Sequence, residues 1–217
     1  MTRTRWTGLT GLLFGVLFFA IDIFGPSTPN TNDAHAVTQF ASYWGENSSQ
    51  TKSRIATLLV TYTCIVLIAF AAGLRDRLRA ADPGPLPSFV LAAGTAAAVL
   101  VSVGAVAGFA TGIAASDIPS FKVDGGISVV LDDMGYMLLA TGLMAAGGMA
   151  VATSIVSRRT GVLPAWTAWL GFLLGLTAVG SIFTAWLGFV GLPIWVVAVS
   201  VALLMRKDTA EVAAPTA

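Results

Sequence analysis

Two neighbouring carboxylates and a phenol lie at the start of one of the most apolar stretches of the chain. They are Asp132, Asp133 and Tyr136 of the segment LDDMGYMLLATG. On a helix Tyr136 is three or four residues from either carboxylate, so the side chains can share one face. Carboxylates beside a phenol can bind a proton, a cation or an amine, or transfer a proton to a substrate. The segment is therefore a candidate for ligand or ion binding.

A third carboxylate, Asp22, is predicted to lie on the same side of a membrane. An apolar helix needs about 20 residues to cross a bilayer. Counting forward from Arg5 places Asp22 near the far end of the first apolar segment, and counting back from Arg158 places Asp132 and Asp133 at that same boundary. A carboxylate inside the hydrocarbon costs about 2.5–3.5 kcal/mol. Asp22 should therefore face the helix bundle or the boundary.

Besides simple exposure to water, two interpretations of these carboxylates remain open from the sequence. In the first, Asp132 or Asp133 caps a helix, where unpaired N–H groups favour negative charge. Asp22 then pairs with Arg54 or Lys122 as a structural tie. In the second, the three carboxylates line an outward-facing pocket for a proton, a cation or an amine, since ionisable groups near membrane depth often mark such sites.

Composition excludes several classes of protein. Hydrophobic residues make up 56% of the chain and charged residues 11%, whereas soluble domains are about 25% charged. The net charge of +1 leaves no broad basic face for a nucleic acid. His35 is the only histidine and Cys64 the only cysteine, so no zinc cluster is predicted. His35 is retained only as a supporting charge in the outer layer, with Arg54 and Lys122. Motifs for phosphate, dinucleotide or metalloprotease chemistry are missing from the sequence, and we predict no catalytic residue, metal or cofactor.

Hydropathy predicts an all-α, polytopic membrane protein with a bundle of six transmembrane helices. We expect a single domain over residues 1–207, an extracytoplasmic loop at 26–53 and a disordered cytoplasmic tail at 208–217. The last two helices follow each other closely and should form a tight hairpin. The six predicted helices lie at about 6–25, 55–74, 88–114, 132–156, 164–183 and 186–205.

Lys and Arg are unevenly divided between the predicted connections. With a cytoplasmic N-terminus, nine of them lie on the inner side and three, Lys52, Arg54 and Lys122, on the outer side. Positively charged connections stay in the cytoplasm during insertion, so both termini are predicted to be cytoplasmic. The nine inner residues are Arg3, Arg5, Arg75, Arg77, Arg79, Arg158, Arg159, Arg206 and Lys207.

The outer loop contains one amphipathic stretch. Val37, Phe40, Ala41 and Trp44 have helical spacing with polar residues between them. This pattern predicts a short helix on the outer membrane surface. The helix either caps the bundle or acts as a lid over a ligand.

A row of glycines is found in the third apolar segment. Gly104, Gly108 and Gly112 are four residues apart, and small residues on one face allow helices to pack closely in a bilayer. We therefore predict that this face lies at the tightly packed centre of the bundle. The alternative is that the glycines line a pore or leave room for a ligand.

The segment RTGVLPAWTAWLG, at residues 159–171, carries a resemblance to known proteins. It resembles the R-T-G-x-L-P-x-W-x-x-W-L-G segment of a family of small six-helix integral membrane proteins from actinobacteria and related bacteria, which is defined as a domain of unknown function. The resemblance implies the six-helix layout and a bacterial plasma membrane. It implies no activity and no functional residue.

The sequence favours a non-catalytic accessory, sensor or scaffold protein of the bacterial plasma (inner) membrane. Its expected partners are the lipid bilayer and either a second membrane protein or another copy of the chain, with no nucleic acid. The alternative function is a small transporter, or an ion- or proton-coupled carrier, that uses the outward-facing acidic site. An intramembrane enzyme acting on a lipid is less well supported, because only an Asp/Tyr pair could supply acid–base catalysis.

Overall fold

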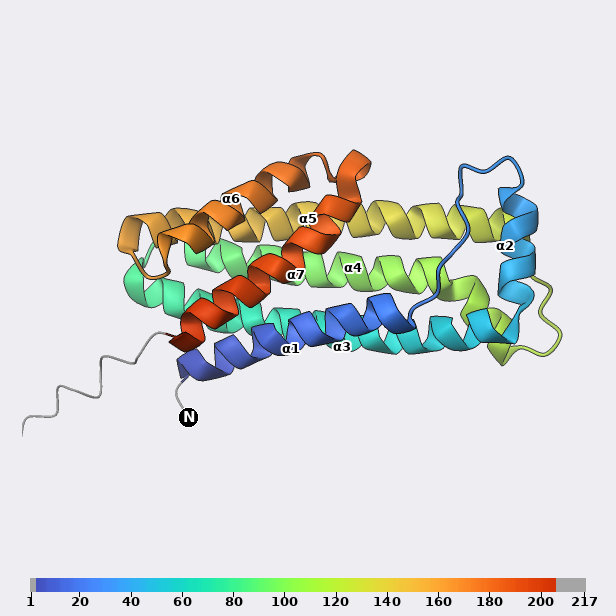
Figure 1. The fold of residues 1–217 in the computed structure, drawn as a ribbon, viewed down its shortest axis with the longest axis horizontal. Coiled ribbons are helices and arrows are strands. Elements are labelled where there is room, and N and C mark those ends of the chain that lie inside the picture. Colours follow the sequence, from blue (N-terminus) through green and yellow to red (C-terminus); the bar gives the residue numbers. More distant parts are fainter. Residues whose placement is uncertain (1–2, 206–217) are drawn as a thin grey trace, which may run out of the picture.

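The computed structural model describes residues 3–205, and every regular element within that range is a helix. The predicted all-α fold is confirmed, whereas the predicted tail at 208–217 lies outside the described residues. Seven helices follow one another along the chain (Figure 1). They are α1 (Arg3–Phe24), α2 (Ala36–Gly45), α3 (Asn47–Ala81), α4 (Leu86–Asp117), α5 (Gly125–Thr160), α6 (Ala165–Val179) and α7 (Ser181–Met205).

Five helices, α1, α3, α4, α5 and α7, are long and apolar enough to cross a membrane. The remaining predicted span, at 164–183, is shorter than expected. Its helix α6 has 15 residues and ends at Val179, which gives a length of about 22 Å against a hydrocarbon thickness of about 30 Å. Helix α7 begins at Ser181, five residues before its predicted start. Only Gly180 separates α6 from α7, and the two helices pack together as the predicted hairpin.

The long helices form a ring. Helix α1 packs against α3 and α7, α3 against α4, α4 against α5, and α5 against α7, while α6 packs outside against α5 and α7. The backbone of α1 approaches neither α4 nor α5 closely in the described part of the chain. The ring order is therefore α1, α3, α4, α5, α7, and its interior is bounded by all five helices.

The two ends of the bundle differ in charge. Helices α1 and α4 begin at the end where α3 and α5 finish, and the α6–α7 hairpin begins and finishes at that same end (Figure 1). The first described residue and the last are thus on one side of the molecule. We call this side the basic end, because seven arginines belong to the helix termini there. These are Arg3, Arg5, Arg75, Arg77, Arg79, Arg158 and Arg159.

Three helices are longer than a bilayer requires. Helices α3, α4 and α5 have 35, 32 and 36 residues, or about 50 Å each at 1.5 Å per residue. They therefore extend beyond the end of α1, and α2 lies across their extensions (Figure 1). The predicted loop at 26–53 is corrected accordingly, because it contains α2 and the first two turns of α3. Because these turns carry polar residues, hydropathy predicts only the apolar part of the helix and misses its first turns.

Helix α2 is held by two large side chains. Phe40 and Trp44 are both 0% exposed, whereas Val37 is 56% exposed. The predicted helix is thus confirmed, but its apolar face packs on α3, α4 and α5 rather than on a membrane surface. Gly112 of the glycine row makes room for it, because a Cβ at that position would lie 2.5 Å from the Trp44 ring. Helix α2 therefore closes this end of the bundle, which we call the α2 end.

The other glycines of the row pack α4 against α5. A Cβ at Gly104 would lie 2.8 Å from the carbonyl oxygen of Gly135. Such an approach brings the two backbones into direct contact, and it confirms the predicted close packing of this face. Gly104 and Gly108 also line the central cavity described below. These glycines therefore both allow α4 to pack closely on α5 and leave room for a ligand.

Candidate functional site

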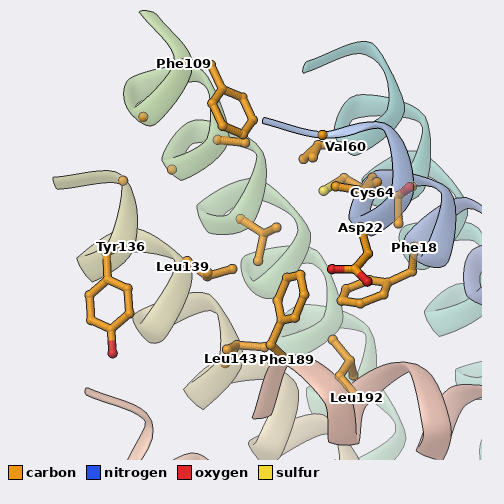
Figure 2. A pocket seen from close by; sticks show the side chains of 18 of the residues that line it. Phe18, Asp22, Val60, Cys64, Phe109, Tyr136, Leu139, Leu143, Phe189 and Leu192 are labelled. Carbon is orange, nitrogen blue, oxygen red and sulfur yellow. The ribbon is translucent and has the colours of Figure 1, made fainter. Parts of the chain in front are cut away.

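A cavity of about 340 Å³ lies inside the ring. Its lining comes from all five ring helices and from residues 25–27, which follow α1. Small-molecule sites usually have volumes of about 300–1,000 Å³ and are mostly apolar with a few polar groups. The cavity fits that description, since most of its surface is formed by aliphatic and aromatic side chains (Figure 2).

The floor of the cavity, toward the basic end, is apolar. The rings of Phe18 from α1 and Phe189 from α7 lie 4.4 Å apart, centroid to centroid. Leu143 and Leu192 extend the floor, and Phe14 is buried beneath it at 2% exposure. Figure 2 shows Phe18, Phe189 and Leu192 grouped together on this side of the cavity. No charged side chain lines this part, which suits an apolar group.

The other end of the cavity carries two carboxylates. Asp22 comes from α1 and Asp132 from α5, two helices whose described backbones do not approach each other closely. Asp132 is half-buried, and Asp22 is exposed at the rim, with its carboxylate turned toward the cavity in Figure 2. The cavity is therefore the place where these two acidic residues face a common space.

The remaining members of the predicted acidic site are less central. Tyr136 lines the cavity with its ring but is 41% exposed, and its hydroxyl does not point toward Asp22 in Figure 2. Asp133 is exposed and is not part of the lining. The structure thus brings together Asp22, Asp132 and Tyr136, and it separates Asp133 from them.

The predicted helix cap is wrong. Helix α5 begins at Gly125, and its N-cap is Asp124, whose Oδ1 accepts a hydrogen bond of 3.0 Å from the Ile127 N–H. Asp132 and Asp133 lie two turns further along, where the backbone N–H groups already have partners within the helix. The two carboxylates therefore do not stabilise the helix terminus.

The predicted supporting charges do not line the cavity. Arg54 forms an ion pair with Asp117 and donates a hydrogen bond of 2.8 Å from Nε to Ser116 Oγ. The predicted tie between Arg54 and Asp22 is thus wrong, because Arg54 lies on the extension of α3, next to the end of α4. Lys122 and His35 are exposed and outside the lining. No group of three or more His, Cys, Asp or Glu residues among residues 3–205 could hold a metal ion.

Replacing Arg54 with glutamine is expected to lower the unfolding free energy by less than about 1 kcal/mol. The Arg54 and Asp117 side chains are 50% and 52% exposed, and exposed ion pairs contribute about 0–1 kcal/mol. Reversible unfolding by SDS in mixed micelles measures the change, with Asp117→Asn as the matched variant. A loss of several kcal/mol would instead identify the pair as a main tie between α3 and α4.

One contact of the site was not predicted from the sequence. The segment between α1 and α2, residues 25–35, passes over the acidic end of the cavity, and we call it the strap. The Thr28 side chain lies beside Asp132. The Tyr43 hydroxyl lies beside the Ser49 side chain and the Ser27 backbone, and burial raises the pKa of Tyr43, which keeps the phenol protonated. The run PSTPNTND signals irregular chain, but it carries no indication of these partners.

Comparisons with known proteins found no matching family model, no matching curated protein and no matching solved structure. The class of protein is therefore defined by fold and site alone. It is a helical membrane protein with five helices able to cross a bilayer and an internal cavity that is apolar at one end and acidic at the other.

Proposed function

We propose that the protein is a multi-pass protein of the bacterial plasma membrane with both termini in the cytoplasm. The arginines of the basic end support this orientation, because positive residues are retained in the cytoplasm. The α6–α7 hairpin supports a six-helix layout, since α6 enters from the basic end and α7 returns to it (Figure 1). The segment at 159–171 supports membership of the six-helix family that it resembles.

For its function, we propose a non-catalytic accessory, sensor or scaffold protein that binds a positively charged ligand in the central cavity. The observation that carries this proposal is the presence of Asp22 and Asp132 in one largely apolar cavity. Asp132 is half-buried, and a carboxylate partly removed from water is stabilised by a nearby positive charge, which a cationic ligand would supply. Neither histidine nor lysine is part of the lining among the described residues. An enzyme working here would have the two carboxylates, Tyr136 and the Cys64 thiol for acid–base chemistry.

A carrier is the second candidate, and α7 supports it. Pro193 lies inside α7, between the cavity-lining Leu192 and Ile194. Proline has no N–H to donate to the carbonyl of Phe189, so the helix can bend at this point more easily than elsewhere. Phe189 and Leu192 both line the cavity floor, and bending of α7 would therefore change the floor.

Thermal unfolding of the purified protein in detergent tests the proposed binding. Scans would cover amines, divalent cations, native lipids and pH for the wild type, Asp22→Asn and Asp132→Asn, with Asp133→Asn as the matched control. A ligand at 100 times its dissociation constant is expected to add about 2.7 kcal/mol. The gain should disappear in the first two variants and persist in the third, because Asp133 does not line the cavity.

Two results would contradict the proposal. If no additive stabilises the wild type, the cavity does not bind these ligands. If Asp133→Asn removes the gain as well, the effect comes from general surface charge rather than from the cavity. Where a compound does stabilise the wild type through the cavity, its flux into proteoliposomes separates a carrier from a sensor or accessory protein.

A further inference from the structure

We infer that the ligand of this cavity is a membrane-resident amphiphile with a cationic ammonium head and a single apolar chain, and that it enters sideways from the bilayer between α1 and α5. This inference rests on the proposed function of the cavity as a cation-binding site. It adds the chemical class of the ligand and its route.

The first support is a window in the ring. Helices α1 and α5 both line the cavity, but their backbones do not approach each other closely in the described residues. Toward the basic end, α7 fills the space between them. A Cβ at Gly15 would lie 2.5 Å from Val197, and Phe18 meets Phe189. Toward the α2 end, the next segment that leads away from α1 is the strap (Figure 1). The window is thus bounded by α1, α5, α7 and the strap.

The cavity reaches the surface at this window. Asp22 of α1 and Tyr136 of α5 belong to the lining, and both are exposed. They stand on opposite sides of the cavity in Figure 2. The opening therefore faces sideways, between two helices that are surrounded by lipid in a bilayer, and a molecule dissolved in the bilayer can reach it directly.

The second support is the polarity gradient along the cavity. Phe14, Phe18 and Asp22 are spaced four residues apart on α1, so they follow one another on one face over about 12 Å. On α5 the lining likewise changes from apolar Leu143, nearer the basic end, to acidic Asp132, nearer the α2 end. Helix α1 has 22 residues and ends at Phe24, so Asp22 lies at the level where hydrocarbon gives way to head groups. An amphiphile in the membrane has the same gradient at the same depth.

The third support is charge. Among the described residues, the lining contains two carboxylates and no Lys, Arg or His. A phosphate or sulfate head group would be repelled by this set, whereas an ammonium group would be attracted. The volume of about 340 Å³ is near the lower limit of small-molecule sites, which favours one chain over two.

The strap argues against entry from water. Pro26 and Ser27 form part of the lining, and the Thr28 side chain lies beside Asp132. The Ser27 backbone lies beside the Tyr43 side chain of α2. The strap thus lies over the acidic end toward the α2 end and narrows access there, although Ser27 itself is exposed.

Photolabelling tests the inference on the wild-type protein in phosphatidylcholine nanodiscs. The probe is dodecylammonium with a diazirine in its chain, and the competitors are dodecyltrimethylammonium, butyltrimethylammonium and dodecyl sulfate. We expect adducts on the cavity-lining peptides of α1 and α5. Dodecyltrimethylammonium should give half-protection at a concentration at least about tenfold lower than butyltrimethylammonium, since roughly two buried methylenes account for a factor of ten. Dodecyl sulfate should not protect. The double variant Asp22→Asn/Asp132→Asn should lose the protected labelling, and Asp133→Asn should retain it.

The contrary results separate the inference from the proposed function. If butyltrimethylammonium protects as well as the dodecyl compound, the cavity is a cation site open to water, so the proposed function stands and the membrane route is wrong. If dodecyl sulfate protects equally, the cationic head group is wrong. If adducts are spread over all apolar helices and no competitor removes them, both the proposed function and the inference are wrong.

Discussion

Replacing Trp44 with alanine is expected to lower the unfolding free energy by about 3–5 kcal/mol, the usual cost of truncating a fully buried Phe or Trp side chain. Trp44 is 0% exposed and is the largest side chain with which α2 packs on the extensions of α3, α4 and α5. The Cβ position of Gly112 lies 2.5 Å from its ring, so the indole occupies a space that α4 provides by having no side chain there. Alanine would leave that space empty.

The indole nitrogen of Trp44 makes Trp44→Phe an informative second variant. Trp44 Nε1 is buried and has no hydrogen-bond partner among the described residues, which costs about 1–3 kcal/mol of stability. Phenylalanine keeps most of the buried ring and removes the unpaired donor. Trp44→Phe should therefore be much less destabilising than Trp44→Ala.

SDS unfolding in mixed micelles measures the change, and Val37→Ala is the matched control on α2. Val37 is 56% exposed, so its truncation should change stability by no more than about 0.5 kcal/mol. Hydrogen exchange in Trp44→Ala should rise first in α2 and the strap. A loss below about 1 kcal/mol for Trp44→Ala would show that α2 is held by other contacts.

Detachment of α2 would also reach the cavity. The strap connects α1 to α2, and it lies beside Asp132 through Thr28 and beside Tyr43 through Ser27. The position of the strap therefore depends on α2 being docked. For this reason Trp44→Ala should weaken ligand binding although Trp44 does not line the cavity.

The helices were predictable because hydropathy alone requires them. A chain in lipid must satisfy its backbone hydrogen bonds within each segment, so an apolar run of sufficient length has to be helical. The ends of α3 and α5 were not predictable in this way. Residues 47–54 are polar, and a hydropathy count ends where the hydrocarbon ends, while the hydrogen-bonded helix continues. Asp124 could have been found, because an acidic residue just before a periodic apolar run is a typical N-cap.

The candidate site was predictable only in part. Depth counting placed Asp22, Asp132 and Asp133 in one layer, because depth depends on position along a single helix. Which of them share a cavity depends on the order of helices in the ring and on the direction each residue faces. Asp133 is next to Asp132 in the sequence but points to another side of α5. Arg54 pairs with Asp117 because the α3 and α4 extensions are neighbours, a fact that no local pattern encodes.

The contact between α4 and α5 leads to the second large effect. Gly135→Ala is expected to lower the unfolding free energy by about 3 kcal/mol, the upper part of the usual range for overpacking. The added Cβ would lie 2.7 Å from the Gly104 carbonyl oxygen and 3.0 Å from the Gly108 nitrogen. Both are backbone atoms, so they cannot turn aside as a flexible side chain would. The two helices would have to move apart.

Gly148→Ala on the same helix is the matched control. A Cβ there would lie 3.5 Å from the Phe89 ring, an ordinary contact distance. Alanine is also favoured over glycine within a helix by about 1 kcal/mol, so this variant should be neutral or slightly more stable in the same SDS titration. Equal behaviour of the two variants would mean that α4 and α5 are not in backbone contact.

Because Gly104, Gly108 and Gly135 line the cavity, separation of α4 and α5 would also widen it. Gly135→Ala should therefore reduce the stabilisation by ligand as well as the stability of the empty protein.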